Sequence, residues 1–198
     1  MTGLLVAIEG PKSVGKTTLI TQLKAKSTET RDWIFTKEPT DSFNLGNEQQ
    51  HVGADLAALI AEDRAQHLTE VIEPALRRGL VVVTDRYVLS SFVFHCLDGV
   101  SSDIVVGRND QFPRPDLLLV LQCSPNTLKE RRAKRRQQTR LSSAISPEAE
   151  ILGYVTYADQ CRPVSGEIVF VYNEIMEDCH IIAERLIADV RAKRSIDL

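Results

Sequence analysis

The chain has few features that would cross-link it or anchor it to a membrane. Its four cysteines, Cys96, Cys123, Cys161 and Cys179, are widely spaced and form no C-x-x-C pair. This spacing argues against a zinc site or a disulfide framework and is typical of a reducing compartment. No apolar run is long enough to span a bilayer, and the N-terminus enters an expected strand without the apolar segment of a signal peptide. We therefore expect a cytoplasmic protein with no membrane partner.

A strong net charge is also missing. The 24 Lys and Arg residues nearly balance the 27 Asp and Glu residues, and the formal net charge is −3. No global field would therefore attract nucleic acid, and we expect no nucleic-acid partner. With 198 residues, of which 43% are hydrophobic, the chain can bury a core without staples. We expect a single domain over residues 1–198.

Apolar runs alternate with helical stretches along the chain. Residues 41–54 are predicted to form a loop or a short irregular helix, Pro74 to kink or split a long helix, and Gly79 to cap it. Repeated strand–helix units with short connections predict an α/β fold, in which helices cover both faces of a parallel sheet. Ligands of such sheets bind beyond the carboxyl ends of the strands. The expected strands cover 4–8, 33–36, 80–84, 116–121 and 167–172, and the expected helices 16–26, 55–78, 89–96, 124 onward, 146–158 and 175–192.

One motif points to a nucleoside triphosphate. Residues 10–17 read G-P-K-S-V-G-K-T, which is the P-loop pattern G-x-x-x-x-G-K-[ST], between an expected strand and an expected helix. Its backbone N–H groups and the helix N-terminus would surround phosphate, Lys16 would reach the β- and γ-phosphates, and Thr17 would ligate Mg²⁺. A glycine-rich turn that merely caps a helix would not explain Lys16 and Thr17. The predicted ATP-phosphate set is Gly10, Lys12, Ser13, Val14, Gly15, Lys16, Thr17 and Thr18.

A second constellation ends the apolar run at 80–84 with Asp85 and Arg86. An aspartate at this position can hold Mg²⁺ directly or through water, and the neighbouring arginine can bind a second phosphate. Glu38 follows the expected second strand and should reach the same edge of the sheet. The alternative for Asp85 and Arg86 is a surface salt bridge between neighbours.

The third feature is a basic stretch at residues 129–140. Arg132, Arg136 and Arg140 are four residues apart and would share one helical face, where they repel one another unless an anion lies among them. We interpret the region at about 132–148 as a lid that closes these arginines over the triphosphate. The alternatives are nucleic-acid binding, which the lack of interleaved aromatic residues weakens, and a solvated basic helix.

Together these motifs resemble the thymidylate kinases, a family of P-loop nucleoside-monophosphate kinases. The most diagnostic set is ordered: A-E-D-R-A-Q-H-L at 61–68, I-E-P-A-L at 72–76 and D-R-Y-V-L-S-S at 85–91. It is similar to the family's ADRAQH, I-x-P-A-L and D-R-Y-x-x-S-S segments. T-K-E-P at 36–39 and P-D-L at 115–117 are similar to two further family segments. The resemblance extends from the first strand to about residue 158.

The resemblance implies the reaction ATP + dTMP → ADP + dTDP with Mg²⁺. It also implies the P-loop NTPase fold with a five-stranded parallel sheet and a small basic lid, usually assembled as a homodimer. Two other classes remain open from the residues alone. One is a kinase for a different or modified nucleotide or nucleoside, and the other is a non-catalytic nucleotide-binding regulator.

Individual roles follow from the resemblance by position. Arg64 and Arg86 would hold the acceptor phosphate, and Lys37 takes the place of a common phosphate-site arginine. Asp85 and Thr17 would organise Mg²⁺. The implied acceptor set is Glu38, Lys37, Ile60, Arg64, Arg86, Ser91, Phe94, His95 and Tyr154. The catalytic set is Lys16, Arg86, Asp85, Arg132, Arg136 and Arg140.

Besides Lys37, further residues depart from the family pattern, among them Lys12, Ile60, Phe94 and His95. Lys12 stands where the family often has an acidic residue, and it either acts as a cation on the transferred phosphate, binds phosphate without a catalytic role, or faces solvent. Ile60 replaces a phenylalanine that stacks on thymine. Phe94 and His95 replace a Tyr-Gln pair, so a hydroxyl that could sense the sugar is lost; His95 either bonds to the base or sugar or is an ordinary helix residue. The residues expected to bind phosphates and Mg²⁺ therefore resemble the family more closely than the residues expected to recognise the base.

Overall fold

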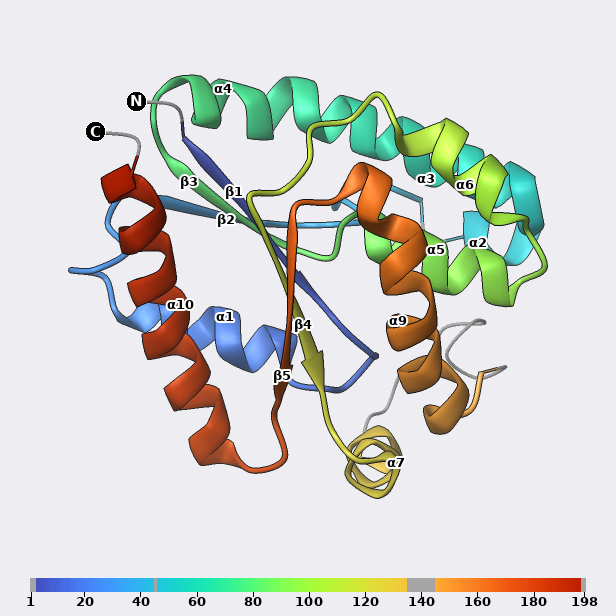
Figure 1. The fold of residues 1–198 in the computed structure, drawn as a ribbon. Coiled ribbons are helices and arrows are strands. Elements are labelled where there is room, and N and C mark those ends of the chain that lie inside the picture. The colour runs from blue at the N-terminus through green and yellow to red at the C-terminus, as the bar shows by residue number, and fades with distance from the viewer. Residues whose placement is uncertain (1–2, 45, 135–144, 197–198) are drawn as a thin grey trace.

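A computed structural model describes residues 3–44, 46–134 and 145–196. Its centre is one five-stranded parallel sheet in the order β2-β3-β1-β4-β5 (Figure 1). The strands are β1 (Leu4–Glu9), β2 (Trp33–Lys37), β3 (Val81–Asp85), β4 (Leu117–Gln122) and β5 (Glu167–Tyr172). The predicted α/β fold with its five-stranded parallel sheet is confirmed, and the expected strand bounds agree with these within one residue at each end.

The sheet separates two hydrophobic cores, because successive side chains of a strand point to opposite faces. In β1, Leu4, Val6 and Ile8 pack into one core, and Leu5 and Ala7 into the other. All six residues of β1 are buried, which explains why this strand reads as a continuous apolar run. The same continuous burial holds for β4.

Helices cover both faces of the sheet (Figure 1). The first core is closed by α1 (Lys16–Ala25), α7 (Pro125–Ala133) and α10 (Met176–Ile196). The second is closed by α3 (Gly53–His67), α4 (Glu73–Arg77), α5 (Val88–Leu97), α6 (Ser102–Asn109) and α9 (Pro147–Cys161). Short α2 (Asn47–Gln50) and the 3₁₀ turn η2 (Arg162–Val164) complete the described elements.

The expected long helix at 55–78 is split near Pro74. A π-helical turn, η1 (Leu68–Ile72), separates α3 from α4. Proline has no N–H to donate to the carbonyl four residues earlier, so the regular helical pattern fails just before it. Gly79 then ends the helix at φ 73°, and Leu80 N–H donates to the carbonyl of Ala75 at 3.1 Å. This is the left-handed cap for which glycine is favoured.

Helix α6 is absent from the sequence prediction, which assigned no element to residues 101–109. Its apolar residues are three neighbours in a row, Ile104, Val105 and Val106, followed by Gly107, so no helical spacing is visible. In the structure only Val105 and Asn109, four residues apart, are buried on this helix. The position of this helix therefore depends on tertiary contacts. One of these is the bond that Asn109 accepts from Arg64, a predicted site residue.

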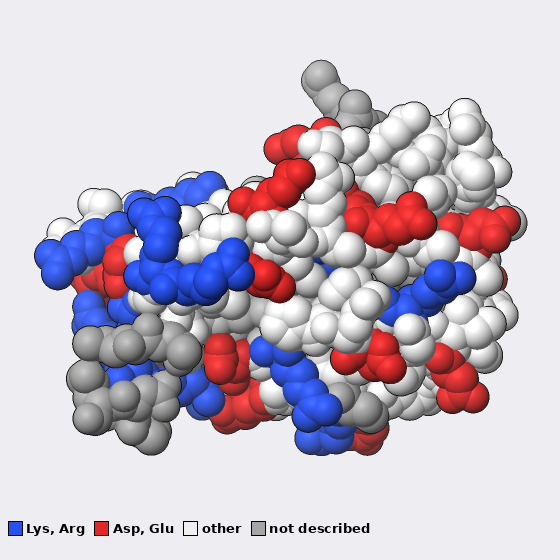
Figure 2. Space-filling view, turned by 90° about the horizontal axis from the view of Figure 1, so that it is seen from above, with Lys and Arg blue, Asp and Glu red and all other residues white. Residues whose placement is uncertain are grey.

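Positive and negative side chains are interspersed on the face shown in Figure 2, with a gathering of Lys and Arg at one end of it. Acidic side chains lie across the middle of the same view. On this face, the Lys and Arg residues of the described stretches form no continuous stripe. Within the three described stretches, no helix has the length and apolarity needed to cross a membrane.

Candidate active site

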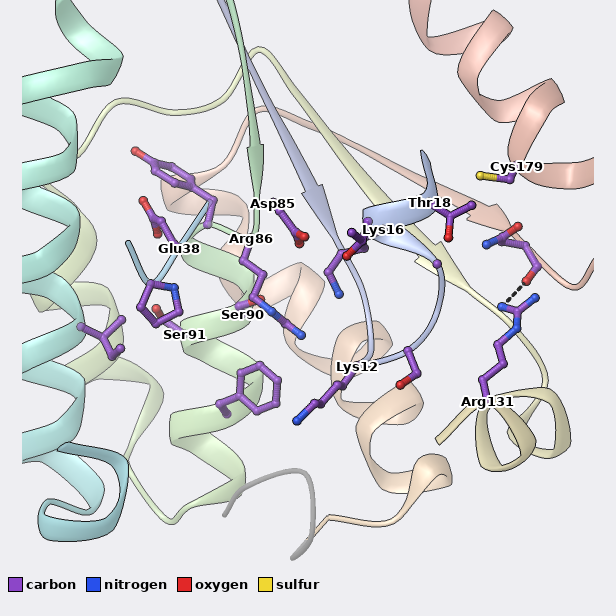
Figure 3. A pocket seen from close by; sticks show the side chains of 18 of the residues that line it. Lys12, Lys16, Thr18, Glu38, Asp85, Arg86, Ser90, Ser91, Arg131 and Cys179 are labelled. Atoms are coloured by element: carbon purple, nitrogen blue, oxygen red, sulfur yellow. Dashed lines mark hydrogen bonds between the residues drawn. The ribbon is translucent and has the colours of Figure 1, made fainter. Parts of the chain in front are cut away.

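A cavity of about 650 Å³ lies at the carboxyl ends of the strands, where the sequence predicts a ligand. Glu38 and Ser91 lie at one end, and Arg131 and Cys179 at the other (Figure 3). Asp85, Arg86 and Lys16 lie between them. The cavity therefore joins the P-loop and the Asp85–Arg86 corner in one space. Its remaining lining includes Lys12, Ser13, Gly15, Thr17, Thr18, Pro39, Leu56, Ile60, Arg64, Tyr87, Ser90, Phe94, His95, Lys134, Asn173, Ile175 and Met176.

The P-loop folds tightly over the end of β1. Gly10 has φ 133°, and a Cβ added there would lie 2.3 Å from the carbonyl oxygen of Leu121. Gly15 has φ 115°, and its Cβ would meet the Asn173 side chain at 2.2 Å. Lys16 Nζ donates to the carbonyls of Gly10 at 2.8 Å and Pro11 at 3.1 Å. Close packing thus requires glycine at both motif positions. The Lys16 side chain lies across the P-loop and bonds to its carbonyls.

The loop is held from behind by the segment after β5. Asn173 Nδ2 donates to the Val14 carbonyl at 2.7 Å, and Arg131 donates to the same carbonyl at 2.9 Å. Arg131 also donates to the carbonyls of Asn173 and Glu174, each at 2.9 Å. Sequence reasoning missed Arg131 because its four-residue spacing rule selected Arg132 instead. Asn173 follows β5, and its position at a strand's carboxyl end is the signal that could have found it.

Arg86 occupies a strained corner between β3 and α5. Its φ is 76°, unusual for a residue with a side chain, and its N–H donates to Ile8 at 2.9 Å. The guanidinium donates to Ser90 Oγ at 2.9 Å and Tyr154 OH at 2.8 Å, and lies 5.1 Å from the centre of the Phe94 ring. Burial acts to lower the pKa of Arg86, but Tyr154 and the carboxylates of Asp85 and Glu9 raise it. The corner therefore presents a permanent cation to the cavity.

A carboxylate missed by sequence reasoning supports this corner from below. Glu9 is fully buried, and its Oε1 accepts N–H bonds from Tyr87 at 2.8 Å and Ser90 at 3.0 Å. Its Oε2 accepts the Ser90 hydroxyl. Burial raises the pKa of Glu9, while the bonds from Ser90 and the charge of Arg86 oppose the shift. Glu9 thus satisfies the first amides of α5 and places Ser90 against Arg86.

Arg64 closes the other end of the cavity and is 1% exposed. Its Nε donates to Glu38 at 2.7 Å and its Nη2 to Ser91 Oγ at 3.1 Å, and Nη1 bonds to Asn109 Oδ1. His67 Nδ1 lies 3.2 Å from the other oxygen of Glu38. The Glu38 carboxylate therefore fixes Arg64, which keeps two of its five N–H donors beyond these bonds.

The chain also matches a known protein family. The sequence model of the thymidylate kinase family matches residues 8–149. The chain belongs to the thymidylate kinase family. A thymidylate kinase of Xanthomonas campestris is 37% identical over 133 residues, which cover 63% of this chain and 58% of that protein. The chain thus matches under two thirds of that relative's length.

A second relative and a solved structure match nearly the whole chain. A probable thymidylate kinase of Pyrobaculum calidifontis is 30% identical over 207 residues, which cover 95% of this chain and 100% of that protein. The solved structure of thymidylate kinase from Candida albicans matches with a TM-score of 0.70 and 20% identity, over 98% of this chain and 93% of that one. The latter likeness supports the fold, and the P-loop NTPase fold expected from the sequence is confirmed.

Most of the site residues that the sequence predicts, from the P-loop motif or from the thymidylate kinase resemblance, line the cavity. These are Lys12, Ser13, Gly15, Lys16, Thr17, Thr18, Glu38, Ile60, Arg64, Asp85, Arg86, Ser91, Phe94 and His95. Gly10 and Val14 lie in the P-loop but outside this lining, and Tyr154 lies behind Arg86 with no exposed surface.

Two further predicted site residues, Lys37 and Arg132, lie outside this lining. The exposed Lys37 forms an ion pair with Asp41 at 2.5 Å, away from the lining. Arg132 pairs with the buried Glu150 and donates to the Ile145 carbonyl at 3.0 Å. Arg136, Arg140 and most of the expected lid fall outside the described residues. The lid role of these three arginines stays a prediction.

Proposed function

We propose that this chain transfers the γ-phosphoryl group of ATP to dTMP and releases ADP and dTDP. The observation that carries the proposal is one cavity whose lining includes the P-loop, Arg86 and Arg64. A phosphoryl transfer requires donor and acceptor phosphates in one space with cations between them. Among the described lining residues, Lys12, Lys16, Arg64, Arg86, Arg131 and Lys134 are basic and only Glu38 and Asp85 are acidic. This balance favours anionic ligands.

The donor would lie at the P-loop end. Ser13, Gly15 and Lys16 of the loop and Thr17 and Thr18 of α1 line this end of the cavity, where backbone N–H groups at a helix N-terminus can surround a triphosphate. Ile175, Met176 and Cys179 give this end an apolar wall, against which the donor base can pack. Lys16 would move from the loop carbonyls onto the β- and γ-phosphates, its role in P-loop enzymes.

The residues present also fit Mg²⁺. Asp85 Oδ1 is buried and has no hydrogen-bond partner among the described residues, and Thr17 lines the same cavity. Carboxylate and hydroxyl oxygens are the hard ligands that Mg²⁺ takes in phosphate sites, usually with several waters. When bound, the ion would neutralise charge on the β- and γ-phosphates.

The acceptor would lie between Arg86 and Arg64. Arg86 would hold its phosphate, so that a phosphate oxygen attacks the γ-phosphorus in line while the bond to the leaving ADP oxygen breaks. The sequence analysis assigned Arg64 to the acceptor phosphate as well. Its buried place beside Ser91 and Asn109 supports a base-facing role instead, because a guanidinium only donates and suits a carbonyl such as thymine carries.

A kinase for another nucleoside monophosphate is the second candidate. Ile60 offers the base an aliphatic wall, and Phe94 turns its ring to the Arg86 guanidinium without a hydroxyl. Both features weaken selection of one base and one sugar.

We extend to this chain the homodimer and cytoplasmic location expected from the sequence, and light scattering during gel filtration would test the dimer.

The deciding experiment is ADP release with Mg²⁺ and ATP, measured against a panel of nucleoside monophosphates and the matching nucleosides. We expect turnover with dTMP above all other acceptors. Preference for another monophosphate would reject dTMP as the acceptor and favour the second candidate function. Turnover with nucleosides alone, or with no acceptor, would overturn both.

A further inference from the structure

A buried carboxylate outside the cavity lining bonds to the P-loop. Glu150 of α9 has no exposed surface. Its Oε1 accepts the backbone N–H of Lys12 at 2.8 Å, and its Oε2 pairs with Arg132 of α7. A fully buried acid is rare unless it is paired, and this one is satisfied from two separate elements. Glu150 therefore joins the P-loop, α7 and α9 at one point.

Arg132 makes the same joint from the other side. Besides Glu150, it donates to the carbonyl of Ile145, just ahead of the Ser146 cap of α9. Arg132 thus holds the start of α9 at two places. One turn after Glu150, on the same helix face, Tyr154 bonds to Arg86. Helix α9 thereby touches both the donor loop and the arginine of the acceptor side.

The bond to Lys12 lies beside a strained residue. Ser13 has φ 74°, a left-handed conformation that a residue with a side chain occupies only where its surroundings hold it. The Glu150 bond fixes the amide just before Ser13, and Val14 N–H donates to Pro11 at 3.2 Å just after it. These two bonds enclose the strained residue. The conformation of the loop at Ser13 is therefore held from both sides.

We propose that Glu150 is a positioning residue for phosphoryl transfer, which orients the P-loop amides through Lys12 N–H. The inference rests on the proposed function and adds to it a residue that never touches either substrate. A merely structural Glu150 would contribute only through its ion pair with Arg132. The two roles separate if the ion pair is removed while the acceptor for Lys12 N–H is kept.

Two double variants make this comparison. Arg132→Met/Glu150→Gln and Arg132→Met/Glu150→Met both remove the buried charges and have similar side-chain volumes. The Gln variant keeps an oxygen that can accept the Lys12 N–H, and the Met variant keeps none. Each is measured for thermal unfolding, for ATP affinity by calorimetry without acceptor, and for kcat and KM with dTMP.

We expect similar unfolding temperatures for the two doubles. We expect kcat/KM for ATP to be about tenfold lower in the Glu150→Met double than in the Glu150→Gln double, because misaligned hydrogen-bond donors bind the phosphates less well in the transition state. Equal ATP affinity and equal kcat/KM in the two doubles would overturn the positioning role. If the Glu150→Met double does not fold, the single variant Glu150→Asp, which keeps Arg132, is compared with wild type, because a carboxylate one methylene shorter keeps the charge but shortens the reach to Lys12 N–H. Wild-type kcat/KM and ATP affinity in that variant would overturn the positioning role. Wild-type protein that neither binds ATP nor releases ADP would instead defeat the proposed function, so the two failures are distinguishable.

Discussion

The guanidinium of Arg86 and the hydroxyl of Tyr154 meet at 2.8 Å across 68 residues of sequence. Ser90 Oγ lies 3.0 Å from the same hydroxyl and donates in turn to Glu9. Burial raises the pKa of Tyr154 to about 12, so its phenol stays protonated at neutral pH. A proton chain from Tyr154 through Ser90 to Glu9 therefore leaves both hydroxyl oxygens able to accept from Arg86.

This arrangement predicts graded losses. Arg86→Ala should lower kcat/KM for the acceptor by at least ~10²-fold, the scale of one preorganised electrostatic donor. Tyr154→Phe removes one bond to Arg86 and leaves Ser90, so it should cost about two- to tenfold. Steady-state kinetics with varied acceptor measure both values, and circular dichroism checks the fold. Unchanged kinetics in Arg86→Ala would remove this residue from the acceptor site.

The P-loop lysine gives a second prediction. Lys16→Ala should abolish transfer and leave the fold intact, because the side chain of Lys16 bonds to carbonyls of the loop itself and would move from them onto the phosphates. ADP release and thermal unfolding are the paired measurements. Thr21→Ala, on the exposed side of the same helix, is the matched control and should retain wild-type turnover. Normal turnover in the Lys16 variant would contradict the P-loop assignment.

Sequence patterns predict the sheet well because the signals are local. A buried parallel strand such as β4 reads as an unbroken apolar run, and Ser124 and Ser146 each accept an N–H bond at the start of a helix. Helix α6 lacks such a signal, because its position depends on Asn109 meeting Arg64 across 45 residues. Contacts of this range leave no period in the sequence.

The candidate site divides in the same way. Lys16, Asp85 and Arg86 belong to motifs whose chemistry can be read from neighbours in sequence. Glu9 and Arg131 act through partners 78 and 117 residues away, respectively, so no local pattern reveals them. Glu9 is also a single acid at the end of an apolar run, where sequence alone does not distinguish a buried carboxylate from a solvated one.

The cysteines provide a third prediction, on accessibility. Cys96 is partly exposed, whereas Cys123, Cys161 and Cys179 are buried. Burial raises the pKa of each thiol, that of Cys161 to about 12. A small alkylating reagent should therefore modify Cys96 first in the native protein, and the other three only after unfolding. Mass spectrometry of timed samples locates the label, and Cys96→Ser should lose the fast phase. Fast labelling of Cys161 would contradict its burial.

Glu9 links the site to the pH dependence of stability. Burial holds the pKa of Glu9 above its ordinary value of 4.5, so between 4.5 and the folded-state pKa the native state binds more protons than the unfolded state. The stability contributed by this proton is complete below 4.5 and is lost as the pH rises through the folded-state pKa. Glu9→Gln keeps an oxygen for the amides of Tyr87 and Ser90 but does not titrate. The free energy of unfolding of wild type minus that of Glu9→Gln should therefore fall as the pH rises from 4.5 through that window.

Urea unfolding of both proteins at a series of pH values measures this difference, in which the other titrating groups largely cancel. The direction is the test, because a carboxylate stabilised mainly by its partners would give the opposite slope. A difference that rises with pH would mean that Arg86 and the α5 amides outweigh burial at Glu9. In that case the hydrogen bonds from Tyr87 and Ser90 and the charge of Arg86 would set the titration of Glu9, and burial would be the smaller effect.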